Sequence, residues 1–180
     1  MEGSSRLFGL LVALAVLAAC DGGDAAAPSP SGPTETVDRR RVEIYSTLIR
    51  QLVELRDVPI YVRSRLCENA NDLGAPEGCT DRLTSEEQGA IAAALEGQHH
   101  IVFVSDLDQL ESDLPASGGT DLTHELVLLG PIEGDGDTVE VPGSHVCGGL
   151  CGGGSVWVLV RADRVWEVEG PAPGEGIWVA

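Results

Sequence analysis

Two segments of the chain carry apolar residues at the spacing of an amphipathic helix. The first is predicted over residues 39–56, with Asp38 as its capping residue. Its apolar stripe consists of Ile44, Tyr45, Leu48, Ile49, Leu52 and Leu55. In the second segment Thr84 and Glu87 have the spacing of a capping box, and the helix that they begin is expected to stop at Gly97.

The remaining apolar runs are short and separated by turn residues, which predicts strands. Residues 60–66 are expected to form one strand, with Ile60 and Val62 on one face, and residues 101–104 a buried strand. From residue 122 onward the pattern is entirely β, with strands expected over 126–129, 138–141, 155–161, 164–169 and 177–179. Two helices followed by a β-meander predict an α+β fold, with both helices packed on one face of a mostly antiparallel sheet.

A hairpin near the end of the chain is expected to turn at Ala162-Asp163. This closing stretch, a Cys-Gly-Gly-Leu-Cys loop followed by two strands with Trp166, resembles the terminal hairpin of uncharacterised exported bacterial domains. It is also similar to the curved sheets of cystatin-like and nuclear transport factor 2-like folds. The resemblance is confined to this stretch and implies no functional residues.

The net charge of the chain limits which classes of molecule it can bind. It has 11 basic residues, all of them arginine, against 29 acidic ones, and its formal net charge is −18. Nucleic acid is excluded as a partner, because binding to phosphates needs clustered positive charge. The negative charge also disfavours docking of the domain onto anionic lipid. It is typical of a solvated exported protein, and the other interpretation is binding of a cation or a basic partner.

After a short polar start, an apolar run extends from Leu7 to Ala19. As a helix this run is roughly 20 Å long, shorter than the ~30 Å hydrocarbon core, which favours a signal peptide over a membrane span. It ends in Leu17-Ala18-Ala19-Cys20, which resembles the lipobox of bacterial lipoproteins. The resemblance implies cleavage before Cys20 and a diacylglyceryl group on its thiol. The alternative is an ordinary secretory signal with a chance cysteine.

These features predict the organisation of the whole chain. Residues 1–19 are expected to be a lipoprotein signal peptide, and residues 20–37, rich in Gly, Pro, Ser and Ala, a disordered tether. Residues 38–180 are expected to form a single α+β domain. The lipid on Cys20 would hold that domain at the extracytoplasmic face of the cell membrane.

Three consecutive arginines, Arg39 to Arg41, occupy the first turn of the first predicted helix. The helix dipole disfavours cations at this position. Two interpretations are open, namely contact with anionic headgroups near the anchor and a solvated run of charge.

If Cys20 carries lipid, four cysteines remain, an even number for an oxidising compartment. Four cysteines allow three pairings, and the simplest is local: Cys67 with Cys79 and Cys147 with Cys151. A metal or redox site built from His145, Cys147 and Cys151 is the alternative, although it lacks a fourth metal ligand and the spacing of a thioredoxin motif.

The sequence therefore predicts a membrane-tethered envelope domain that binds a protein, a peptide or a small ligand without a cofactor. It contains no pattern of catalytic residues that local structure does not explain equally well. Two alternatives stay open: a metal-handling or redox domain that uses His145, Cys147 and Cys151, and a hydrolase-like pocket on a curved sheet.

Overall fold

The structure of the protein is a computed structural model that describes residues 37–53, 58–68, 78–79, 81–105, 124–147, 151–175 and 177–179. The predicted signal peptide, Cys20 and the tether as far as residue 36 lie outside the described residues.

Helix α1 (Arg39–Leu52) begins where predicted and buries the predicted stripe as far as Leu52. Asp38 caps it, because its carboxylate accepts hydrogen bonds from the amides of Arg40 and Arg41 at 2.9 and 3.3 Å. The predicted end at residue 56 is wrong. Val53, a buried β-branched residue, already has extended backbone with φ −86° and ψ 132°, so the helix stops there.

The main sheet has seven strands in the order β4-β1-β5-β6-β7-β8, with β9 paired to β7. Their bounds are β1 Pro59–Arg63, β4 His100–Val104, β5 Glu125–Leu129, β6 Thr138–Val146, β7 Gly152–Ala162, β8 Val165–Pro171 and β9 Trp178–Val179. β5 to β8 form the predicted antiparallel meander, whereas β4, β1 and β5 are parallel. Helix α2 (Ser85–Leu95) lies between β1 and β4 in the chain, which allows these two strands to be parallel. The predicted α+β class is confirmed.

The predicted strand over residues 60–66 is in fact two strands that belong to different sheets. β1 ends at Arg63, and β2 (Arg65–Leu66) pairs antiparallel with β3 (Asp81–Arg82) in a separate two-stranded ribbon. Ser64 at the break is buried, and its amide donates to the carbonyl oxygen of Val104 at 2.8 Å. Apolar residues recur at positions 60, 62 and 66, and Ser64 alone interrupts this alternation, so the sequence pattern predicted one continuous strand.

The hairpin between β7 and β8 turns one residue later than predicted, at Asp163 and Arg164. Both residues have positive φ, 49° and 70°, as a two-residue hairpin turn of this kind requires. Ala162 instead pairs with Val165 as the last rung of the ladder.

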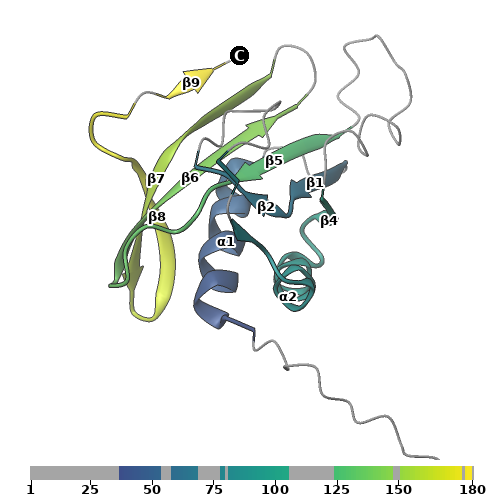
Figure 1. Cartoon of the computed structure of the whole chain (residues 1–180), viewed down its shortest axis with the longest axis horizontal. Coiled ribbons are helices and arrows are strands. Elements are labelled where there is room, and N and C mark those ends of the chain that lie inside the picture. Colours follow the sequence, from purple (N-terminus) through teal and green to yellow (C-terminus); the bar gives the residue numbers. More distant parts are fainter. Residues whose placement is uncertain are drawn as a thin grey trace, which may run out of the picture. The chain divides into compact units, whose positions relative to one another are not determined.

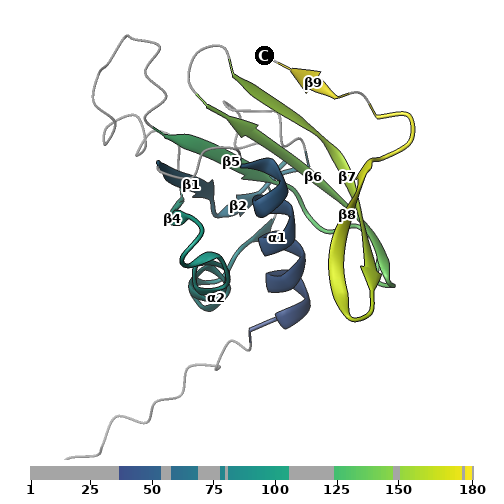
Figure 2. The ribbon, with the colours of Figure 1, turned by 180° about the vertical axis from the view of Figure 1, so that it is seen from behind.

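The core lies between the helices and one face of the sheet. α1 packs on β5, β6 and β8, and α2 packs on α1 and β4, as Figures 1 and 2 show from opposite sides. Gly143 on β6 allows this close approach, because a Cβ there would lie 2.9 Å from Leu48 Cδ2 and 3.2 Å from Leu52 Cδ1.

Candidate functional site: a polar cavity beside helix α2

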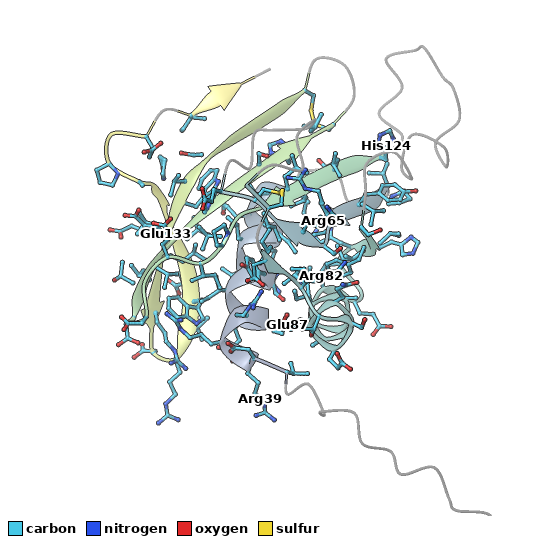
Figure 3. All side chains as sticks on the ribbon, viewed as in Figure 1. Arg39, Arg65, Arg82, Glu87, His124 and Glu133 are labelled. Atoms are coloured by element: carbon cyan, nitrogen blue, oxygen red, sulfur yellow. A yellow bond between two sulfur atoms is a disulfide. The ribbon has the colours of Figure 1, made fainter. Side chains whose placement is uncertain are left out.

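Two of the three arginines at the start of α1 are tied to other parts of the fold. The guanidinium of Arg40 donates to the carbonyl oxygens of Gly134 and Gly136 at 3.2 and 3.1 Å. It also lies over the Trp166 ring, 5.6 Å from the ring centroid. Arg39 is exposed and extends from the start of the helix in Figure 3.

Arg41 connects α1 to the beginning of α2. Its guanidinium lies 3.1 Å from Asp81 Oδ2 and 3.2 Å from Glu87 Oε1. Glu87 also completes the predicted capping box, since its Oε2 accepts from the Thr84 amide at 2.9 Å while Thr84 Oγ1 accepts from the Glu87 amide at 3.1 Å. The interpretation of the arginine run as solvated charge is therefore wrong for Arg40 and Arg41, which are structural links.

A cavity of about 600 Å³ opens beside this ion-pair cluster. Its lining is mostly polar and combines guanidinium, hydroxyl, carboxylate and amide groups with one aromatic ring. The lining residues are Arg41, Ser64, Asp81, Arg82, Leu83, Thr84, Ser85, Gln88, Phe103 and Ser105. They come from both helices, the β2–β3 ribbon and the ends of β1 and β4, so the cavity depends on the tertiary fold.

The cavity lining has groups suited to holding a polar molecule. Ser64 is buried, whereas Ser85 and Ser105 are exposed, and each hydroxyl can donate or accept a hydrogen bond. The described lining includes no histidine or cysteine, so no imidazole lies there to activate a serine hydroxyl. The hydroxyl, amide and charged groups of the described lining can form hydrogen bonds and ion pairs with such a molecule.

The β2–β3 ribbon forms one wall of the site and is held in several ways. Cys67 directly follows β2 and is bonded to Cys79, which lies just before β3. The Leu83 amide donates to the Ser64 carbonyl oxygen at 2.8 Å, and Leu66 and Leu83 are both buried in the core. The disulfide therefore closes the connection between the two strands that carry Arg65 and Arg82.

The second cysteine pair lies away from this cavity. Cys147 and Cys151 are bonded to each other at the connection between β6 and β7, so both local pairings that the sequence favours are present. His145 lies on β6 opposite Gly153 and is half-buried. Because the disulfide occupies both sulfurs, the structure does not bring His145, Cys147 and Cys151 together as free metal ligands. Within the described residues, no group of three or more potential metal-ligating side chains is present.

Tyr45 lies behind Arg41 on α1 and is fully enclosed. Burial raises the pKa of its phenol well above the usual range, and Arg41 partly opposes this effect. The neutral hydroxyl donates to the Gly130 carbonyl oxygen at 3.0 Å. Tyr45 therefore links α1 to the end of β5 and is a structural residue.

Most of the cavity residues could not be identified from the sequence. The spacing of Arg82, Ser85 and Gln88 matches no motif, so nothing in the sequence marks them as parts of one site. The available signal was the Cys67–Cys79 spacing, which predicted a closed loop but not that its two ends pair as strands.

Comparisons of the chain with protein-family models, with curated proteins and with solved structures find no match in any of the three. The described part of the chain has no helix long and apolar enough to cross a membrane. The likeness of residues 17–20 to a lipobox, and that of the closing hairpin to exported domains, stay predictions from the sequence.

Proposed function

We propose that this protein is a lipid-anchored, extracytoplasmic binding domain that takes a small polar ligand in the cavity beside α2. The observation that carries the binding function is this cavity, about 600 Å³ in volume and within the usual size of small-molecule sites. Its wall is ordered by a disulfide and by the ion pairs of Arg41, so the site is pre-formed.

The anchor and the location rest on a different set of observations. The lipobox-like segment ends at Cys20, and a Gly- and Pro-rich stretch separates it from α1. The two disulfides support an oxidising compartment, because such bonds are rare in the cytosol. Labelling cells with a radioactive fatty acid tests the anchor. The label and the membrane fraction should both be lost in Cys20→Ala, and their retention would contradict the proposal.

A pair of substitutions in the first turn of α2 tests the cavity. Ser85 is exposed and lines the cavity, whereas Glu86 is exposed beside it and does not. The full chain is purified from its own membranes, and the small molecules released on denaturation are identified by mass spectrometry. A compound should accompany the wild type and Glu86→Trp but be depleted from Ser85→Trp, because the indole would fill the cavity. Equal release from all three proteins would contradict a ligand in this cavity.

A further inference from the structure

Arg65 and Arg82 face each other across the β2–β3 ribbon. The antiparallel register pairs their Cα atoms directly, so both side chains lie on the same face, with Cβ atoms roughly 5 Å apart. Figure 3 labels the two residues next to each other above α2. Like charges in this position repel and destabilise a ribbon unless another group lies between them.

No acidic side chain in the described part of the chain neutralises this pair. The backbone amide of Arg82 donates to Asp81 Oδ1 at 2.7 Å, and its carbonyl oxygen accepts from Arg41. Within the described residues, the guanidinium groups of Arg82 and Arg65 have no hydrogen bond and no ion pair. The adjacent Asp81 is held by Arg41 at 3.1 Å and, by the alternation of a strand, lies on the other face. Among the described residues, two neighbouring cations without an ionic partner are unexpected, since the chain has 29 acidic residues in all.

Of the two arginines, Arg82 lines the cavity, whereas Arg65 lies directly across the ribbon from Arg82 and is not part of the described lining. Arg82 lines the cavity together with Ser64, Ser85 and Ser105, and the Cys67–Cys79 disulfide holds the ends of the ribbon together. Both arginine side chains reach solvent, since Arg65 is half-buried and Arg82 is exposed. A guanidinium binds carboxylate or phosphate oxygens through two parallel hydrogen bonds, and two guanidinium groups can share one such anion.

We propose that Arg65 and Arg82 bind the carboxylate or phosphate group of a small organic anion, whose polar remainder lies against the serine hydroxyls of the cavity. This inference rests on the binding function proposed above and names the chemical class of its ligand. The bound anion removes the repulsion between the two cations, so the repulsion in the free protein is a cost of function.

The test uses the full chain in neutral detergent and three probes, namely glucuronate, inorganic phosphate and uncharged glucose. Glucuronate or phosphate should bind saturably at low ionic strength, and more weakly as salt is added. Arg65→Gln and Arg82→Gln should each weaken this binding by about tenfold or more. Arg39→Gln makes the same change of charge at an exposed site and should change affinity by less than about twofold.

A second measurement separates binding from folding. The melting temperature of the free protein should be unchanged or higher in Arg65→Gln and Arg82→Gln, because either substitution removes the repulsion. The inference is overturned if neither charged probe saturates the wild type, or if both variants bind as the wild type does. Failure of this kind leaves the anchor and the cavity standing, because Cys20→Ala and Ser85→Trp test those independently.

Discussion

Arg41 Nε lies 3.2 Å from Glu87 Oε1, and the side chain of Glu87 is only 4% exposed. The carboxylate also caps α2 through the Thr84 amide, so one buried group fixes the start of α2 and its attachment to α1. A desolvated carboxylate needs a compensating charge. Arg41 is thus the residue on which the shape of this side of the cavity depends.

Arg41→Gln should lower the free energy of unfolding by about 3 kcal/mol, because it leaves the Glu87 charge buried without its partner. Arg39→Gln is the matched control in the same helical turn, and its effect should stay within about 0.5 kcal/mol. Urea denaturation followed by circular dichroism measures both. Equal stability of the two variants would show that the ion pair contributes nothing.

Tyr45→Phe should lower the free energy of unfolding by about 1 kcal/mol at neutral pH, because the buried carbonyl oxygen of Gly130 loses its hydrogen-bond donor. The raised pKa of Tyr45 also has a consequence at alkaline pH. Above pH ~10 the phenol ionises in the unfolded chain but stays protonated in the folded one, so unfolding releases a proton and stability falls as pH rises. Below that pH the effect of this group is constant.

Chemical denaturation at several pH values measures the alkaline effect. The decline of stability above pH ~10 should be shallower in Tyr45→Phe than in the wild type. Since the chain has two tyrosines, the variant also leaves Tyr61 as the only phenol in absorbance titrations. An unchanged slope in the variant would rule out Tyr45 as the source of the decline.

Two glycines should respond to alanine in opposite ways. Gly143→Ala places a methyl group against Leu48 and Leu52, which should cost about 1–3 kcal/mol through overpacking between α1 and β6. Gly89 lies within α2 with no atom within 4 Å of an added Cβ, so Gly89→Ala should stabilise the protein by about 0.5–1 kcal/mol. Thermal unfolding of both variants checks the signs. A neutral Gly143→Ala would mean that α1 does not lie this close to β6.

Replacing both Cys67 and Cys79 with Ala should lower the free energy of unfolding by about 3 kcal/mol, because the disulfide closes a loop between residues 12 positions apart.

Thiol titration of the denatured, unreduced protein is the direct check on the pairing. The four cysteines of the domain should react only after reduction. Reaction of Cys147 and Cys151 before reduction would instead revive the metal or redox interpretation with His145.

The sequence predicted those parts of the fold that depend on local signals. The caps at Asp38 and Thr84 placed both helices, and alternating apolar residues placed the meander. The break at Ser64 was missed because it depends on the Val104 carbonyl oxygen, which is distant in sequence. The parallel pairing of β1 with β4 and β5 is equally non-local.

The site was harder to predict than the fold, because its residues come together only through contacts between positions distant in sequence. Arg65 and Arg82 are 17 positions apart, and only the ribbon register makes them neighbours. In the sequence Arg41 is part of a run of three arginines, and only the tertiary fold brings its partners on α2 and β3 beside it. The cysteine pairs were predictable because their spacing in the sequence is short.

We propose that Cys20 holds the protein at the membrane, and the N-terminal peptide of the mature protein provides the sharpest test of this anchor. The full chain is extracted from membranes, digested and analysed by tandem mass spectrometry. We expect a first peptide that begins at Cys20, continues with Asp21, and carries a diacylglyceryl group on the Cys20 thiol. A mature N-terminus at any other residue, or Cys20 without lipid, would contradict it.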